Sequence, residues 1–338
     1  LKREYRGSLS AIIRQPNPRR DLFHPGYVFG SIQTSRGCPM NCSFCSVTAF
    51  NGNHYRYRPI EDIIEEWKHI PQKYVAIVDD NLMGNTREAQ QRAIELFTAI
   101  ESTGHKKQWI GEASLSIADN DEVLRTAARS GCKTIFLGVE TEREDQLKSA
   151  NKKVNLRIGS KYYDHVFRKI QKHGIGAIAG FIFGWPSETY ETIDNRIEFM
   201  RHCRADTIQA TLLTPLPGTV LFHQLEKENR IELNHYPEDW KFYDSGQLVF
   251  HPDKMERLEL QKYYFKKIAR LYRPSEVKRR FYLTWLRTRK LSTAYMTYMS
   301  HIIFSNVLFG IIKPGNIKWV ERVLGIRKSK LLRSLRSK

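Results

Sequence analysis

The chain has 338 residues, of which 41% are hydrophobic and 27% charged, and it contains five cysteines. This composition excludes an intrinsically disordered chain, a collagen and a disulfide-stabilised scaffold. Single cores stop growing at roughly 250–300 residues, so the length predicts one main domain with an additional region. The sequence starts at Leu1 without an initiator Met or a secretion signal, which suggests a segment of a longer cytoplasmic protein.

The net charge of +19 is concentrated near the C-terminus. Residues 254–338 hold 22 Lys and Arg but only four Asp and Glu, a net charge of +18, which leaves +1 for the rest of the chain. A basic region of this kind attracts an anionic partner, such as a membrane surface or a nucleic acid. We therefore expect such a partner to bind the C-terminal quarter.

Six short runs rich in Val, Ile and Phe alternate with longer stretches of helical periodicity. Right-handed crossovers place successive parallel strands side by side, so the alternation predicts an α/β fold in which six units form a partial barrel. After Pro215 only residues 247–250 offer another strand, too few for a complete eight-unit barrel. The expected strands are residues 29–34, 74–79, 109–116, 134–140, 175–183 and 207–214. The expected helices are residues 60–70, 86–103, 119–130, 156–173 and 187–203.

A cysteine-rich loop follows the first expected strand. Cys38, Cys42 and Cys45 have the spacing C-x3-C-x2-C in SRGCPMNCSFC. Three thiolates on a short loop can bind three irons of a cubane cluster and leave the fourth iron open, and soft sulfur ligands suit iron–sulfur clusters or zinc. A zinc site needs a fourth ligand, for which His54 is the nearest candidate. The other two cysteines are expected to be ordinary buried thiols, Cys132 and Cys203.

This loop and its position after a strand resemble the radical S-adenosylmethionine (SAM) superfamily, over about residues 15–225. The resemblance implies a [4Fe-4S] cluster at the mouth of a six-unit partial barrel, with the open iron chelated by the amino and carboxylate groups of SAM. It also implies that reductive cleavage of SAM yields a 5′-deoxyadenosyl radical, which abstracts hydrogen from the substrate. The electron would come from an external donor of the flavodoxin or ferredoxin type.

The resemblance also assigns cofactor-binding residues. Phe44 matches an apolar position beside the adenine, although ordinary core packing is an equal alternative for it. Asp79 or Asp80 would receive the methionine amino group in place of the family's usual Glu, and Glu140 matches an acidic residue directed toward SAM. The fifth strand carries a glycine that lets a ligand approach the backbone, or that serves helix–sheet packing. Further residues expected at the cofactor are Ser114, Gly180, Pro215 and Leu216.

Three segments resemble the branch of the superfamily in which a cobalamin-binding domain precedes the barrel: NPRRDLFHPGY, YRYRPIEDIIEE and TLLTPLPGTVLF. This branch mostly transfers methyl groups to unactivated carbon. The cobalamin-binding motif D-x-H-x-x-G is absent, since the nearest string, DLFHPG, has a different spacing. Cobalamin would therefore require a domain upstream of Leu1, or the protein lacks it.

These features predict a radical SAM enzyme, with cobalamin-associated methyl transfer to a small or lipid-like substrate as the favoured reaction. The expected regions are a linker (1–28), the partial barrel (29–225) and a basic, mainly helical region (226–338). A second hypothesis is a tRNA-modifying enzyme similar to the methylthiotransferases, but neither a second cysteine set nor a small terminal β-barrel is recognisable, so nucleic acid is the less favoured partner. A third is a non-catalytic zinc or RNA-binding module.

Residues 291–312 contain no Lys, Arg, Asp or Glu and are flanked by basic residues. Their polar residues make a poor membrane-spanning helix, while the apolar residues at 291, 295, 298, 299, 302 and 303 share one helical face. The segment is therefore expected to be either an amphipathic helix on a membrane surface or a helix folded against the barrel. The first alternative predicts peripheral contact with the inner face of the cytoplasmic membrane.

Overall fold

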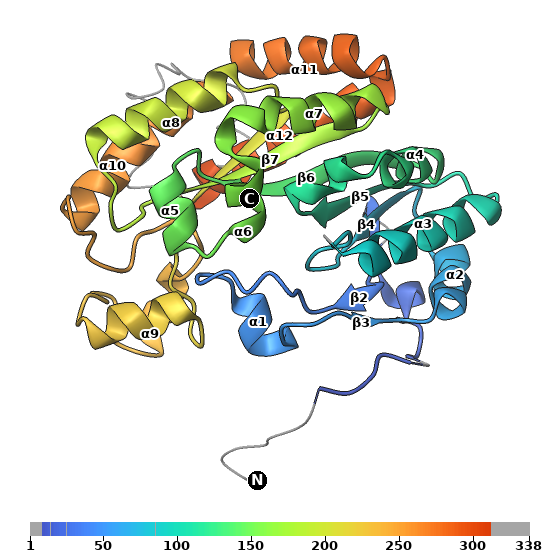
Figure 1. Cartoon of the computed structure of the whole chain (residues 1–338), viewed down its shortest axis with the longest axis horizontal. Helices are drawn as coiled ribbons and strands as arrows, with labels where there is room; N and C mark the ends of the chain where they lie inside the picture. The colour runs from blue at the N-terminus through green and yellow to red at the C-terminus, as the bar shows by residue number, and fades with distance from the viewer. Residues whose placement is uncertain (1–8, 14, 25, 85, 312–338) are drawn as a thin grey trace.

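A parallel sheet of six strands forms the centre of the computed structural model, which describes residues 9–13, 15–24, 26–84 and 86–311 (Figure 1). The strand order β1-β4-β5-β6-β7-β8 follows the chain, and each neighbouring pair is parallel. The predicted six-unit α/β fold is therefore confirmed. The strands are β1 (Phe29–Ile32), β4 (Tyr74–Ile77), β5 (Gln108–Ala113), β6 (Cys132–Glu140), β7 (Gly176–Phe183) and β8 (Thr207–Leu212).

Helices connect these strands and begin at the capping residues that the sequence offers. The Thr86 hydroxyl accepts a hydrogen bond from Ala89 N, and the Asn120 side chain accepts from the first turn of its helix, so both helices start with satisfied backbone donors. The connecting helices are α2 (Ile60–His69), α3 (Arg87–Ser102), α4 (Asp121–Arg129), α5 (Glu144–Ser149), α6 (Lys153–Ile158), α7 (Tyr163–Lys172) and α8 (Tyr190–His202).

Two expected elements differ from the structure. The single helix expected over residues 156–173 is divided into α6 and α7, because Gly159 adopts a φ of +76°, a value outside the helical region that glycine tolerates best. Residues 247–250 form no strand and contribute only an isolated bridge between Phe250 and Ile231. Short 3-10 helices occupy Arg20–Leu22, Leu115–Asp119, Ser160–Tyr162, Glu238–Phe242 and Ala269–Tyr272.

The cysteine loop lies between a small antiparallel pair, β2 (Ser35–Arg36) and β3 (Arg56–Tyr57), and contains α1 (Ser46–Asn51). After β8, helix α9 (Val220–Lys227) is tied to this loop, because Leu221 N donates to Ser43 O. Ser43 N in turn donates to Ala150 O, beyond the end of β6. The loop is thereby fixed at the C-terminal ends of the strands.

The C-terminal helices cover the edge of the sheet instead of extending away from it. Tyr264 Oη donates to Ala210 O at 2.9 Å and Tyr272 Oη donates to Ile208 O at 3.0 Å, so carbonyls of the edge strand β8 gain partners. No helix in the described part of the chain is long and apolar enough to cross a membrane. The covering helices are α10 (Arg257–Ile268), α11 (Pro274–Thr288) and α12 (Leu291–Ile311).

Candidate functional site

A cavity of about 230 Å³ lies at the C-terminal ends of the strands. Cys38, Cys42 and Cys45 all contribute to its wall, so the sequence spacing brings three thiols to one cavity. Four of the other predicted residues also line it: Phe44, Asp80, Ser114 and Glu140.

The three cavity thiols are free, and burial raises the pKa of each of them, that of Cys42 to about 11. The positive charge of Lys152 opposes this shift. Each iron of a cubane takes one cysteine, so the ligands of such a cluster need to face a common space rather than share a single ion. Among the described residues, no three His, Cys, Asp or Glu are grouped to bind one metal ion. Three thiols around a cavity are a donor set that fits a cubane cluster.

Asp79 and Asp80, which follow β4, accept hydrogen bonds from the cysteine loop and from the residues just before it. Asp79 is buried outside the cavity lining, where it accepts hydrogen bonds from Thr34 N at 2.6 Å and from the hydroxyls of Thr34 and Ser35. Asp80 lines the cavity, but its Oδ2 accepts from Gly37 N at 2.9 Å and from Asn51 Nδ2 at 3.2 Å. Asp79 therefore has its hydrogen-bond donors just before the cysteine loop and Asp80 has its donors inside the loop, while a contact of either carboxylate with the amino group of SAM stays a prediction.

Glu140 ends β6 in an unusual conformation, with a φ of +66° at a non-glycine residue. Lys152 Nζ donates to its Oε1 at 2.6 Å and lies 5.9 Å from the centre of the Phe44 ring. Gly138 makes this arrangement possible, because a Cβ at that position would lie 2.4 Å from Glu140 Oε1 and 2.8 Å from Lys152 Nζ. The sequence analysis missed Lys152, whose only sign was a pair of lysines after the fourth strand.

Glu112, on β5, is a second residue that the sequence analysis missed. Its side chain is exposed to the cavity, and burial together with the charges of Asp80 and Glu140 raises its pKa to about 6. Within the described part of the chain its carboxylate has no hydrogen-bond or ion-pair partner. An acidic residue inside an apolar strand was the signal that could have identified it, because burying a carboxylate is costly unless it is paired.

Besides Asp79, three predicted cofactor residues do not line the cavity. Gly180 on β7 is buried, and a Cβ there would lie 2.6 Å from Phe136 Cζ, so this glycine makes room for a ring that itself faces the cavity. Pro215 and Leu216 follow β8, and Leu216 O accepts from the Thr219 hydroxyl in the turn that starts α9. They belong to the segment that supports the cysteine loop.

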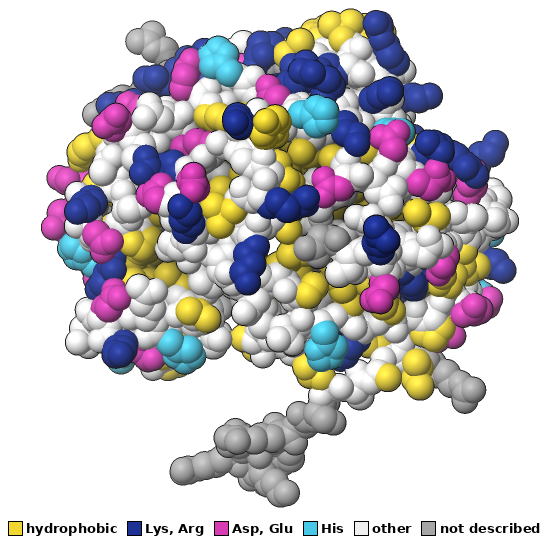
Figure 2. All heavy atoms as spheres, in the orientation of Figure 1, with side chains coloured by type: hydrophobic (Ala, Val, Ile, Leu, Met, Phe, Trp, Pro, Cys, Tyr) yellow, Lys and Arg dark blue, Asp and Glu magenta, His cyan; other side chains and the backbone are white. Residues whose placement is uncertain are grey.

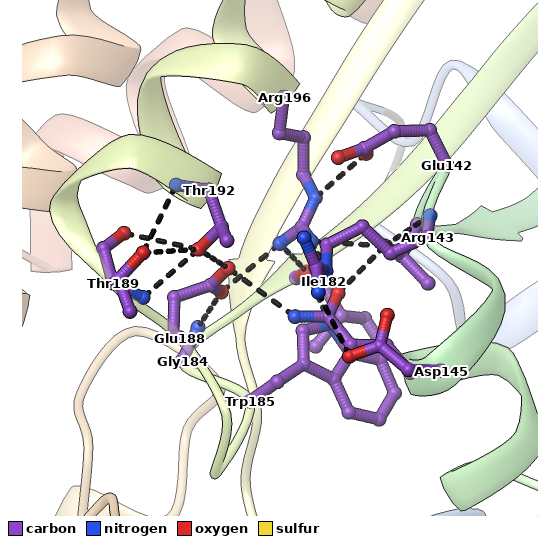
Figure 3. Close-up of polar contacts among 12 residues, drawn as sticks. Glu142, Arg143, Asp145, Ile182, Gly184, Trp185, Glu188, Thr189, Thr192 and Arg196 are labelled. Carbon is purple, nitrogen blue, oxygen red and sulfur yellow. Dashed lines mark hydrogen bonds and ion pairs between the residues drawn. The ribbon is translucent and has the colours of Figure 1, made fainter. Parts of the chain in front are cut away.

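Arg196, on α8, connects the residues that follow β6 with β7 and the turn after it (Figure 3). Its side chain is fully buried, with Nη1 3.0 Å from both Glu188 Oε2 and Ile182 O, and Nε 3.0 Å from Glu142 Oε2. Nη2 donates to Thr141 Oγ1 at 2.8 Å. One guanidinium therefore holds the residues that directly follow Glu140.

Glu188 extends this connection to the turn after β7. Its Oε2 also accepts from Gly184 N at 2.9 Å, and its Oε1 accepts from the Thr192 hydroxyl (Figure 3). Trp185, in the same turn, meets Phe44 edge to face at a ring separation of 5.9 Å. The buried ion pair thus fixes the surface on which the middle of the cysteine loop packs.

The family comparison decides the assignment, since residues 32–200 match the model of the radical SAM superfamily. The chain belongs to the radical SAM superfamily. The cysteine spacing had indicated the same superfamily. Bacteriochlorophyllide d C-12(1)-methyltransferase of Chlorobaculum tepidum is 27% identical over 82% of this chain and 62% of its own length. The hopanoid C-2 methylase of Rhodopseudomonas palustris is 32% identical over 61% of this chain and 39% of its own. The chain thus spans less than two thirds of the length of these two relatives.

Solved structures agree on the fold. The radical SAM enzyme OxsB, solved with aqua-cobalamin and SAM bound, superposes with a TM-score of 0.54 and 16% identity, over 91% of this chain and 55% of its own. The methyltransferase TsrM from Kitasatospora setae, solved with cobalamin and a [4Fe-4S] cluster, gives a TM-score of 0.53 and 20% identity, over 59% and 39% of the two chains.

Proposed function

We propose that this radical SAM enzyme is a cobalamin-associated methyltransferase that acts on a small or lipid-like substrate. The observation that carries the proposal is a cavity lined by three free thiols and by Glu112, a carboxylate without a partner in the described part of the chain. Relatives named as methyltransferases of a bacteriochlorophyllide and of hopanoids support methyl transfer to a hydrophobic carbon framework.

Cys38, Cys42 and Cys45 would hold the [4Fe-4S] cluster, and SAM would occupy the cavity between the cluster and β5–β6. When bound and reduced by an external one-electron donor, the cluster supplies the electron that cleaves the sulfonium of SAM. Phe44 and Phe136 offer apolar ring surface within the same cavity.

Glu112 is the residue we assign to the ammonium group of SAM. Of the three cavity carboxylates, Asp80 is hydrogen-bonded to the cysteine loop and Glu140 is paired with Lys152. Among the described residues, Glu112 alone of these three keeps both oxygens without a partner, and its side chain is exposed to the cavity. Burial and the charges of Asp80 and Glu140 raise its pKa, so a cationic ligand group would stabilise its ionised form, whereas a hydrocarbon surface would not.

Cobalamin would be supplied by a part of the protein that precedes Leu1, as in the branch that the sequence resembles. The described residues 9–13, 15–24 and 26–28 lead into β1.

Isotope labelling tests the proposed reaction for any substrate that accepts a methyl group. Cells that express the full-length protein are fed methionine with a deuterated methyl group, and lipid and pigment extracts are compared by mass spectrometry. A labelled methyl product should appear with the wild-type protein and disappear when all three cavity cysteines are replaced by Ala. A Cys132→Ala, Cys203→Ala variant should retain it, because both thiols are buried outside the cavity lining. Labelled tRNA as the sole product would favour the RNA-modifying alternative.

A further inference from the structure

The helix pair α11 and α12 presents an apolar outer surface, and many of the side chains on its inner surface are polar. Toward the sheet, Thr293 Oγ1 donates to Gly174 O, and Thr297 O accepts from Thr207 Oγ1. Arg280 and Thr284 are also buried, bonded to Ala205 O and to Asp206. Seven large side chains of the pair are instead exposed: Tyr282, Trp285, Leu286, Leu291, Tyr295, Met299 and Ile303.

This arrangement differs from that of an ordinary surface helix, which exposes a polar face to water. The four residues on α12 recur every fourth position, so they form one continuous stripe along the helix. Contiguous exposed apolar surface of this kind marks a binding site for a partner rather than a solvated face.

The charges around the stripe are almost all positive. Lys278, Arg279, Arg289 and Lys290 are exposed, whereas α12 carries no charged residue and Glu276 is paired with Arg279 and Arg280. Lys and Arg side chains lie beside apolar ones over α11 at the upper edge of the molecule (Figure 2). The sequence after α12, residues 312–338, adds nine Lys and Arg against one Glu.

From this chemistry we infer that the outer face of α11 and α12 binds the surface of an anionic lipid membrane. Amphipathic surfaces that bind membranes carry Tyr, Trp, Lys and Arg at the boundary between headgroups and acyl chains, with aliphatic side chains between them. Phosphates of a nucleic acid would attract the same cations but would leave Leu291, Met299 and Ile303 against water.

The membrane-binding face lies at the opposite end of the strands from the cysteine cavity. α11 and α12 contact the starts of the strands, through Gly174, Asp206 and Thr207, while the cavity lies at their C-terminal ends (Figure 1). Binding therefore recruits the enzyme to the membrane without pressing the cavity against it. The inference does not rest on the proposed methyl transfer.

A matched pair of double variants tests the inference on the full chain. The test variant, Lys290→Glu with Tyr295→Ser, changes the outer face of α11 and α12. The control variant, Lys161→Glu with Tyr162→Ser, changes a basic–aromatic pair before α7. The exposed fraction of Tyr162 is 53%, close to the 52% of Tyr295. The face variant should still fold, because an acidic residue directly before α12 complements the helix dipole. Circular dichroism checks this for both variants.

Co-sedimentation is measured with vesicles of equal parts phosphatidylcholine and phosphatidylglycerol, and with pure phosphatidylcholine. The wild-type protein should bind the anionic vesicles. The Lys290→Glu, Tyr295→Ser variant should bind them at least about tenfold more weakly, and the Lys161→Glu, Tyr162→Ser variant should bind them as well as the wild type does. Binding should weaken as salt rises. Equal binding by both variants, no binding by the wild type, or binding of bulk tRNA instead of vesicles would overturn the inference.

Discussion

Replacing Glu112 by Gln removes one negative charge from the cavity and preserves the size of the side chain. If the carboxylate receives the ammonium group of SAM, the variant loses a charge-assisted hydrogen bond, which contributes about 1.5–3 kcal/mol. The affinity for SAM should therefore fall by about tenfold to a hundredfold. Asp80 and Glu140 are not equivalent substitutes, because Asp80 Oδ2 already accepts hydrogen bonds from the cysteine loop and Glu140 Oε1 is already paired with Lys152.

The pH dependence of binding gives a second signature of the same contact. The Glu112 pKa is raised to about 6, so the carboxylate is ionised above that pH and protonated below it. The ammonium group of an amino acid stays protonated up to about pH 7.7–8.0. SAM affinity should consequently rise about tenfold between pH 5 and pH 7 in the wild type, and Glu112→Gln should flatten this part of the profile.

Equilibrium dialysis of SAM against the anaerobically reconstituted protein measures both effects. Glu122→Gln provides the control, since Glu122 lies on α4 outside the cavity lining, where it pairs with Arg125. Iron content is measured in each sample, so that loss of the cluster is not mistaken for loss of the contact. An unchanged SAM affinity and an unchanged pH profile in Glu112→Gln would refute the assignment.

Three further substitutions test other parts of the account. Arg196→Met should lower the free energy of unfolding by about 3–5 kcal/mol in denaturant titrations, because it leaves the buried Glu188 unpaired; a change below about 1 kcal/mol would contradict this role. Gly138→Ala should weaken SAM binding while iron content stays at the wild-type level, since the new Cβ displaces the Glu140–Lys152 pair; undiminished binding would argue against a role for that pair. Burial lowers the pKa of His301 to about 4, so the free energy of unfolding of the wild type should fall by up to about 3 kcal/mol between pH 6.5 and pH 4. The His301→Gln variant should lose less stability over this range. Parallel stability curves for the two proteins would show that His301 is not the cause of the loss.

The sequence predicted the strands well because their signal is local. Parallel strands that are buried on both faces are continuous runs of apolar residues, as in β7, and these runs can be recognised whatever their neighbours are. The division between α6 and α7 was missed, since a glycine inside a helical pattern shows its positive φ only in the structure.

The sequence predicted only part of the cavity, because the cavity is lined by residues from several separate segments. Cys38, Cys42 and Cys45 are close in sequence, so their spacing alone indicated a common site. Lys152 and Glu112 come from separate segments, and only the folded chain shows which carboxylates are already paired. The orientation of α12 was also beyond the sequence, because Thr293 and Thr297 face the sheet while an apolar stripe of the same helix is exposed.

The central claim is that the three cavity thiols bind a cluster that cleaves SAM. The most direct measurement is the formation of 5′-deoxyadenosine from SAM by the anaerobically reconstituted, dithionite-reduced protein. The wild type and the Cys132→Ala, Cys203→Ala variant should form the product, and the Cys38→Ala, Cys42→Ala, Cys45→Ala variant should lack both the brown chromophore and the product. Product formation by the triple variant, or its absence from iron-loaded wild type, would contradict the account.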